Sequence, residues 1–299
     1  MIRVANAPCS WGVLEFAGGG KPAGYATVLD EIHATGYAGT ELGDWGFMPT
    51  DPRRLASELA ARQLQLVGAF VPIAFADESA HDAGLATAVK TASLMRDAGA
   101  TGAFIVLSDN NGSVPEREQQ AGRIRAEHHL AEEAWATFAA GADRVARAVW
   151  EQTGLRSVFH PHCGGYVETP DEIDELMRLT DPERLGLVLD TGHVLYAGGD
   201  PLEVFNAHRD RVRHVHFKDC DLNVAKAVRA QGLGYLAAVR SQLFCELGTG
   251  AVDFAGISKA LAAAAYDGWI VVEQDVFPGY GSPKQSAQKS RDYLRTLGL

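Results

Sequence analysis

The sequence lacks the features that mark an exported or membrane-bound protein. Its four cysteines lie far apart and form no CxxC pair, which is typical of reduced thiols rather than of a disulfide framework. No apolar run approaches the roughly 18 residues that span a bilayer. The start, MIRVANAPCSWGV, has one basic residue and no long apolar core. We therefore expect a cytoplasmic protein that does not contact a membrane.

Positive charge is scarce as well. The chain carries 27 Lys and Arg residues against 38 Asp and Glu residues, a formal net charge of −11, and no Lys/Arg run concentrates positive potential on one segment. Such a chain would repel a phosphate backbone, so nucleic acid is not an expected partner. A GxGxxG turn, the sign of a dinucleotide site, is also missing after the first candidate strand, where the sequence reads WGVLEFAGGGKP.

What the sequence does contain, from end to end, is an alternation of short β-branched runs with longer helical patterns. The candidate strands are 3–10, 39–44, 64–71, 103–109, 156–162, 185–193, 212–219 and 269–276. Helical segments lie between them, for example 51–63, 84–100, 133–154 and 254–266. Apolar strands that alternate with helices predict a parallel sheet covered on both faces. Eight such units favour a single (β/α)8 TIM barrel domain, an α/β fold over residues 1–299, rather than a doubly wound open sheet.

Acidic and histidine side chains lie where the predicted strands reach the C-terminal face of the barrel. They are Glu41 on the second strand, His160 and His162 on the fifth, Asp190 and His193 on the sixth, His214 and His216 on the seventh, and Glu273 and Asp275 on the eighth. The two longest interruptions, about 110–131 and about 220–253, reach the same face, where loops build the active sites of such barrels. We therefore predict a functional site in the mouth of the barrel.

Histidines and carboxylates from neighbouring strand ends give a mixed nitrogen and oxygen set that suits Mn, Co, Zn, Fe or Mg ions. Because side chains alternate along a strand, the two histidines of HPH at 160–162 share one face, as do those of HVH at 214–216, and either pair can face the lumen. Taken alone, one histidine is more often a core residue, and Asp190 is a candidate helix N-cap. Together, ionisable groups at the ends of apolar strands are costly to bury without a cation, so they predict a divalent metal.

Several segments carry a resemblance to a known family. They are APCSWGV at 7–13, GTELGDWGFMP at 39–49, HPHCGGYVETPDEI at 160–173, LDTGHVLYAGGDP at 189–201, RHVHFKD at 213–219, LGTGAVDF at 247–254 and GWIVVEQDV at 268–276. Over nearly its whole length the chain resembles the xylose-isomerase-like sugar isomerase/epimerase superfamily of TIM barrels. Within it, the chain is most similar to the inosose dehydratase (2-keto-myo-inositol dehydratase) branch.

The resemblance implies a metal site. The superfamily holds one divalent ion, often Mn or Co, on a strand-five carboxylate, a strand-six Asp, a strand-seven His and a strand-eight Glu, and the last three match Asp190, His216 and Glu273. The first position falls on His160, where the usual ExH pattern reads HPH in this chain. That departure leaves three alternatives open: His160 binds the metal, Glu168 reaches in from the following loop, or a water takes the place.

The resemblance also suggests catalytic residues. His162 and His193 match positions near the substrate, with supporting or core-filling roles left open. Lys218 is expected to hold a substrate oxygen, although an ion pair with Asp219 at the rim is the alternative. Glu41 is a candidate for the far wall of the pocket and completes the expected catalytic set.

Four further residues are expected to bind substrate. Trp45 is a candidate for the pocket wall and Trp11 for stacking on a sugar ring, although plain packing explains each tryptophan equally well. Asp219 and Asp275 are the expected polar contacts. The glycines of LGTG at 247–250 are interpreted as a loop bend rather than a phosphate site, because no lysine follows them.

A metal bound by a carbonyl and the neighbouring hydroxyl of a polyol acidifies the C–H bond between them and holds the resulting enediolate. Isomerases, epimerases and dehydratases share that step. The resemblance favours a lyase that dehydrates 2-keto-myo-inositol to a cyclic diketone, with an epimerase or isomerase of a keto sugar as the alternative. The small-molecule substrate is not expected to be phosphorylated, because the strand ends carry no basic cluster.

The same fold is compatible with two other functions. Metal-dependent apurinic endonucleases share the superfamily fold, but they use more histidines and a basic DNA-facing surface, and the acidic total argues against that activity. A non-catalytic polyol sensor would lack turnover. Barrels of this kind often pair through their outer helices, so a homo-oligomer is expected by analogy alone.

Overall fold

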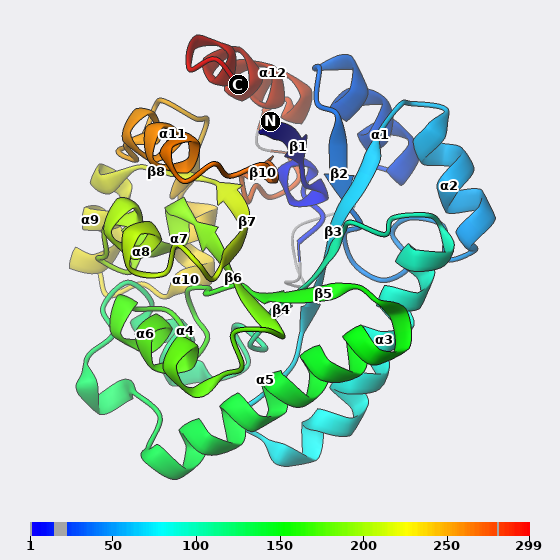
Figure 1. Cartoon of the computed structure of the whole chain (residues 1–299). Coiled ribbons are helices and arrows are strands. Elements are labelled where there is room, and N and C mark those ends of the chain that lie inside the picture. Colours follow the sequence, from blue (N-terminus) through cyan, green and yellow to red (C-terminus); the bar gives the residue numbers. More distant parts are fainter. Residues whose placement is uncertain (1, 15–22, 280) are drawn as a thin grey trace.

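Eight parallel strands close into a barrel in the computed structural model, which describes residues 2–14, 23–279 and 281–299 (Figure 1). The order around the barrel is β1, β10, β7, β6, β5, β4, β3, β2. The strands are β1 (Arg3–Asn6), β2 (Gly39–Glu41), β3 (Gln65–Pro72), β4 (Phe104–Ser108), β5 (Arg156–Phe159), β6 (Leu185–Asp190), β7 (Val212–Phe217) and β10 (Trp269–Val272). The predicted (β/α)8 barrel is confirmed, and every expected strand is present.

Most of the strands end earlier than the sequence predicted. The fifth was expected to run to residue 162 but ends at Phe159, and the eighth was expected to run to residue 276 but ends at Val272. His160 and Glu273 therefore lie one residue beyond their strands. They remain at the barrel mouth, because the amide of His160 still donates to Leu107 O and the amide of Glu273 to Phe217 O.

The helices form a ring outside the barrel, which Figure 1 shows along the barrel axis. Their bounds are α1 (Tyr25–Ala34), α2 (Pro52–Ala60), α3 (His81–Asp97), α4 (Pro115–Gln120), α5 (Glu132–Thr153), α6 (Pro170–Leu179), α7 (Thr191–Tyr196), α8 (Pro201–Ala207), α9 (Leu222–Ala230), α10 (Tyr235–Arg240), α11 (Phe254–Ala263) and α12 (Pro283–Thr296). Short 3-10 turns occupy Pro8–Trp11, Glu78–Ala80 and Ala126–His128. Side chains cap several helices, as Asp51 does for α2 and Asp253 for α11, so the local sequence sets where these helices begin.

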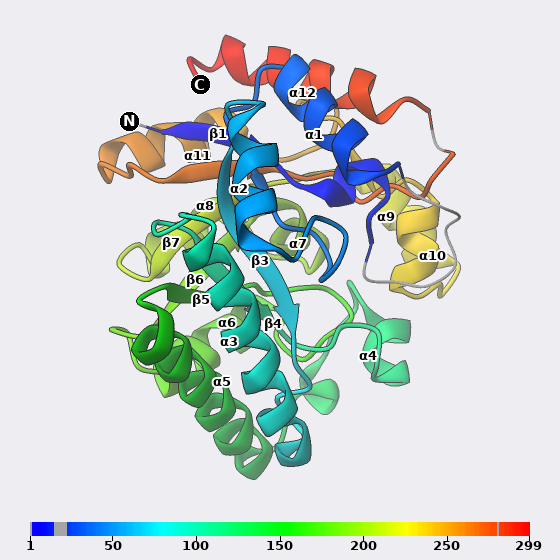
Figure 2. The same cartoon turned by 90° about the vertical axis from the view of Figure 1, so that its right-hand side faces the viewer.

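The two long interruptions form a cap of secondary structure beside the mouth. The first contains α4, and the second contains α9, α10 and the antiparallel pair β8 (Asp219–Cys220) and β9 (Phe244–Cys245). Figure 2 shows α4, α9 and α10 on the same side of the molecule. They share an apolar cluster that includes Cys163, Tyr196, Tyr235 and Phe244. The cap therefore has a small core of its own, separate from the core between barrel and outer helices.

A buried polar network ties this cap to the barrel. Arg117 of α4 donates to both carboxylate oxygens of Glu172 on α6, at 2.8 and 2.9 Å, and to Gly165 O at 2.7 Å. Arg117 and Glu172 are each 1% exposed, so the pair is almost fully removed from water. A bidentate arginine–carboxylate pair of this kind holds two segments in one fixed orientation.

All four cysteines are free, as their spacing predicted. No helix in the described residues is long and apolar enough to cross a membrane.

Candidate metal centre

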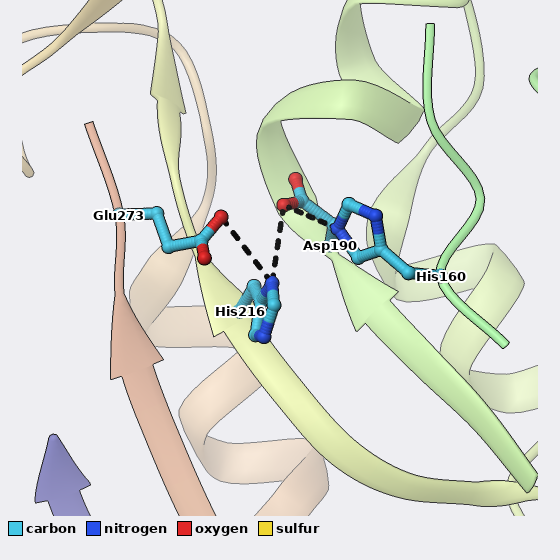
Figure 3. Close-up of side chains that lie close together, drawn as sticks. All are labelled: His160, Asp190, His216 and Glu273. Carbon is cyan, nitrogen blue, oxygen red and sulfur yellow. Dashed lines mark hydrogen bonds and ion pairs between the residues drawn. The ribbon is translucent and has the colours of Figure 1, made fainter. Parts of the chain in front are cut away.

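Four predicted side chains converge at the mouth. His160, Asp190, His216 and Glu273 are buried, and one potential ligand atom of each lies within 4.8 Å of the others (Figure 3). Asp190 Oδ2 lies 3.2 Å from His160 Nε2 and 3.7 Å from His216 Nδ1, and His216 Nδ1 lies 3.3 Å from Glu273 Oε2. The strand register explains the convergence, because Asp190 of β6 and Val271 of β10 are both direct neighbours of His216 on β7.

Asp190 uses its two oxygens for different purposes. Oδ1 accepts the backbone N–H of His193 at 2.9 Å and thereby caps α7. Oδ2 faces His160 and His216. Burial would raise the pKa of Asp190, but Lys218 and the neighbouring histidines outweigh it and lower that pKa well below its usual value. The carboxylate is therefore ionised, and its Oδ2 directs negative charge at the centre.

Glu41 orients His216 and is itself held by His214. Glu41 Oε1 accepts from Nε2 of His216 at 3.0 Å and from Nε2 of His214 at 2.8 Å. Burial would raise the pKa of Glu41, but His216 and His214 hold it down at about 2. Gly68 of β3 makes room for this carboxylate, since a Cβ there would lie 2.6 Å from Glu41 Oε1. Hydrogen bonding of a ligand imidazole to a carboxylate is the usual device that fixes its tautomer.

The donor set fits a cation. With the Nε2 proton of His216 directed at Glu41, its Nδ1 carries a lone pair that points at oxygens of Asp190 and Glu273, which are acceptors too. Three electron-rich atoms facing one another repel unless a proton or a metal ion lies among them. Burial would lower the pKa of His216, but Glu273 and Glu41 raise it well above its usual value. A proton and a divalent ion would therefore compete for this position.

Charge balance points the same way. The buried groups of the mouth include four carboxylates, Glu41, Asp190, Glu273 and Asp275, and one lysine, Lys218. With neutral imidazoles, four negative charges against one positive charge leave three negative charges uncompensated. Uncompensated buried charge is costly, and a divalent ion would reduce it.

Of the two imidazoles in the centre, His160 has fewer hydrogen bonds to fix its ring. Its Nδ1 is buried without a hydrogen-bond partner among the described residues. A metal-ligating histidine normally donates its second ring N–H to an acceptor, as His216 does to Glu41. The geometry therefore supports His216 as a ligand more strongly than His160.

Lys218 lies directly beside the centre. Its Nζ is 3.0 Å from Glu273 Oε2, 3.0 Å from Asp275 Oδ2 and 3.1 Å from His193 Nε2. Burial would lower the pKa of Lys218, but Asp275, Glu273 and Asp190 raise it well above its usual value. The side chain is therefore an ammonium group although it is only 1% exposed.

His162 and His193 stack on one another at 3.9 Å between ring centroids. His162 Nδ1 lies 2.8 Å from Cys163 O, and because a carbonyl only accepts, this nitrogen carries the proton. Burial, with His160 and Lys218 nearby, holds the pKa of His162 well below its usual value. The ring is therefore neutral, with its lone pair on Nε2.

The pocket at the centre has both polar and apolar lining residues. His160, His162, His216, Lys218, Glu273, Asp275 and Glu41 supply polar groups, and Pro8, Val13, Leu14 and Phe70 supply apolar surface. A polyol could place its oxygens against the first set and its carbon skeleton against the second, which is the usual division in small-molecule sites.

Three predicted substrate residues are not brought to this pocket. The Trp11 indole N–H donates to Glu31 at 2.7 Å and the ring packs in the core. Trp45 is 41% exposed and lies under Lys90 at 4.0 Å. Asp219 accepts four backbone N–H bonds, from Cys220, Gly248, Gly250 and Val252. The packing alternative describes Trp11, whereas Trp45 lies at the surface, and Asp219 holds the loop bend.

Glu168, one alternative for the fourth metal ligand, is held by backbone groups instead. Its two oxygens accept the backbone N–H groups of Gly122, at 2.6 Å, and Gly164, at 2.9 Å. It belongs to none of the groups in the described residues that could hold a metal. Glu168 therefore joins the loops after β4 and β5, and both of its oxygens are engaged by backbone N–H groups.

Sequence reasoning missed Tyr235. Its hydroxyl donates to Asp275 Oδ2 at 3.3 Å, and its ring lies against His162 at 5.3 Å between centroids. Only its position in the long interruption 220–253, expected on the C-terminal face, pointed toward the site.

Known proteins resemble this chain over its full length. It is 32% identical over 293 residues to the inosose dehydratase of Lacticaseibacillus casei, covering 98% of this chain and 96% of that protein. The probable 3-DHS dehydratase AsbF of Bacillus anthracis has a TM-score of 0.65 at 14% identity, covering 99% of both chains. The IolI protein with a bound zinc atom has a TM-score of 0.71 at 15% identity, covering 99% of this chain and 97% of that one.

The sequence model of the family described as "Xylose isomerase-like TIM barrel" matches residues 29–297, which confirms the resemblance noted in the sequence. The chain is therefore an enzyme that belongs to the xylose isomerase-like TIM barrel family.

Proposed function

We propose that the chain is a divalent-metal-dependent lyase that removes water from a cyclic keto-polyol such as 2-keto-myo-inositol. Full-length similarity to inosose dehydratases supports the coarser class, a keto-polyol dehydratase or epimerase. The observation that carries the proposal is the convergence of His160, Asp190, His216 and Glu273 beside Lys218, at a pocket that all of them except Asp190 line.

His216, Asp190 and Glu273 would hold the ion, with His160 as the fourth ligand. When bound, the ion supplies Lewis acidity, which polarises a ketone carbonyl and acidifies the neighbouring C–H bond. Mn or Co is the proposed metal, and Zn suits the same nitrogen and oxygen donors.

His162 is the proposed general base. It lines the pocket, and the hydrogen bond of its Nδ1 to Cys163 O leaves the lone pair on Nε2. A neutral imidazole in this tautomer can take a proton from the carbon next to a carbonyl. Loss of that proton turns the substrate into an enediolate, and a β-hydroxyl can then leave as water when it takes a proton from the His162 imidazolium or the Lys218 ammonium group.

Lys218 is the proposed partner of the substrate oxygens. Glu273 and Asp275 hold its ammonium group beside the pocket that Lys218 lines, where its N–H bonds are donors. A charged donor stabilises the negative charge that develops on a departing hydroxyl. His193 and Asp275 fix the position of this ammonium group, and Asp275 is in turn held by Tyr235.

A panel of inososes and keto sugars, incubated with Mn, Co or Zn in D2O, tests the proposal. Dehydration should give a new ultraviolet absorbance and a product lighter by one water. Epimerisation, the alternative function, should give solvent deuterium in the sugar without loss of water. No turnover with any ion would overturn the enzymatic proposal, and full turnover after chelation would overturn its metal dependence.

Glu273→Gln is the matched variant, because it keeps the shape of the side chain and removes one charge from the centre. Metal content after gel filtration and turnover should fall together. Unchanged values of both would remove Glu273 from the ligand set. A cytoplasmic location and a homo-oligomer stay predictions.

A further inference from the structure

Lys218 Nζ lies at the centre of a set of potential metal ligands. Its neighbours are Asp275 Oδ2 at 3.0 Å, Glu273 Oε2 at 3.0 Å, His193 Nε2 at 3.1 Å and, farther away, Asp190 Oδ2 at 3.7 Å. Ligand atoms of His162, His193 and Asp275 lie within 4.8 Å of one another and form a group that could hold a metal ion. Two imidazoles with two carboxylates suit the same ions as the centre next to it.

The contact between His193 and Lys218 indicates that the imidazole lone pair faces this position. An ammonium group has donors and no acceptor, so His193 Nε2 must accept from Lys218. The backbone N–H of Cys163 points at the other ring nitrogen from 3.3 Å, and a neutral imidazole cannot accept at both atoms. We assign the acceptor to Nε2, because the Lys218 contact is shorter and carries a charge. His193 thus offers Lys218 the lone pair that a metal ion would use.

The fold makes a specific path for the lysine side chain. Gly192 at the start of α7 lies against its aliphatic part, and a Cβ at that position would be 2.7 Å from Lys218 Cγ. The ring of Phe244 lies on another side, with its centroid 4.9 Å from Nζ. The ammonium group is therefore enclosed and held among the carboxylates and imidazoles.

We propose that Lys218 fills a second cation position, formed by His193, Asp275 and Glu273 beside His162, and so restricts this centre to one divalent ion. Glu273 faces both positions, as a carboxylate does in two-metal sites whose ions lie about 3.5–4 Å apart. A metal ion would draw Asp275, Glu273 and His193 in from 3.0–3.1 Å to about 2.0–2.2 Å, so these side chains would each move by about an ångström. The lysine supplies one positive charge together with N–H donors. A second ion would supply two positive charges and no hydrogen-bond donor.

Cobalt stoichiometry tests this inference. Wild type, Lys218→Ser and Lys218→Ser/His193→Gln are loaded with Co, separated by gel filtration and analysed for bound metal. Lys218→Ser should bind one more ion per chain than the wild type, and the double variant should lose that extra ion. Lys226→Ser, a change of an exposed lysine on α9, is the matched control and should leave the stoichiometry as it is.

The test depends on the difference in bound cobalt per chain between the variants, and not on the number of ions that the wild type binds. The inference rests on the proposed function only in naming the first ion. A wild type without metal would overturn that function, whereas an extra ion in Lys218→Ser would still support the second position. A folded Lys218→Ser with wild-type stoichiometry would overturn the inference.

Lys218→Ser can also lose its fold when the carboxylates lose their counter-ion. Cobalt should then restore folded protein, because an ion that binds only the native state stabilises it. Circular dichroism with and without cobalt measures this recovery, which the double variant should not show. A Lys218→Ser chain that stays unfolded in cobalt would contradict the proposal.

Discussion

Glu168 should make the protein less stable as the pH rises, and Glu168→Gln should remove that loss. The side chain is 1% exposed, and burial raises its pKa to about 7 in spite of two backbone N–H bonds and nearby Arg117. In the unfolded chain a glutamate titrates near 4.3. Between these two values the native state holds a proton that the unfolded state has lost, so the free energy of unfolding falls as the pH rises.

The magnitude follows from the two pKa values. Between pH 5 and pH 8 this single group should take about 2.5 kcal/mol from the free energy of unfolding, at about 1.36 kcal/mol for each pH unit in which only the native state is protonated. Gln imitates the protonated acid and does not titrate. The stability of Glu168→Gln relative to wild type should therefore rise by about 2.5 kcal/mol from pH 5 to pH 8.

Urea unfolding at the two pH values measures the effect, with chelator in all samples so that metal binding contributes nothing. Glu203→Gln, an exposed position on α8, controls for the loss of one carboxyl group. The same difference between Glu168→Gln and wild type at both pH values would show that Glu168 has an ordinary pKa. It would then bridge Gly122 and Gly164 as a carboxylate throughout this range.

Three further outcomes are expected. Glu41→Gln should weaken metal binding by about 10–100-fold, because His216 loses the carboxylate that orients it. Competition with a chelating dye measures the affinity, and an unchanged affinity would show that Glu41 does not orient His216 for metal binding. Arg117→Met should cost about 3–5 kcal/mol in urea unfolding, since Glu172 stays buried and unpaired, and Glu172→Leu in the same chain should recover much of that loss. His160→Glu should retain metal and shift preference from Co toward Mn and Mg, measured by competition between the ions, and an unaltered preference would show that His160 is not a ligand.

The barrel could be predicted because its signal repeats. Eight apolar runs, each followed by a helical pattern, leave few ways to cover both faces of a parallel sheet. The strand ends were harder to predict. The β-type sequence continues through HPH at 160–162 and EQDV at 273–276, yet the regular pairing of the strands stops at Phe159 and Val272. Sequence alone cannot tell a residue that continues the strand from one that leaves it at the mouth.

The residues brought together by strand register could also be predicted. Asp190, His216 and Glu273 lie at the ends of three adjacent strands, and parallel pairing places such ends side by side. Contacts that depend on loops could not. Tyr235 reaches Asp275 from a helix that begins 15 residues after Cys220. The glycines at 247–250 indicate a bend, but nothing in the sequence indicates that Asp219 accepts the backbone N–H groups of Gly248, Gly250 and Val252.

Asp190 shows why two interpretations of one residue need not exclude each other. As an isolated acid before a short helix it is an N-cap, and as one of several acids and histidines at strand ends it is a metal ligand. The structure supports both, because a carboxylate has two oxygens: Oδ1 accepts the backbone N–H of His193 in the first turn of α7, while Oδ2 faces the centre. The helix cap fixes the side chain, so Oδ2 reaches the centre without the entropy cost of ordering a free rotamer. One residue thus links the start of a helix to the position of a ligand, which is how a local sequence signal sets the geometry of the site.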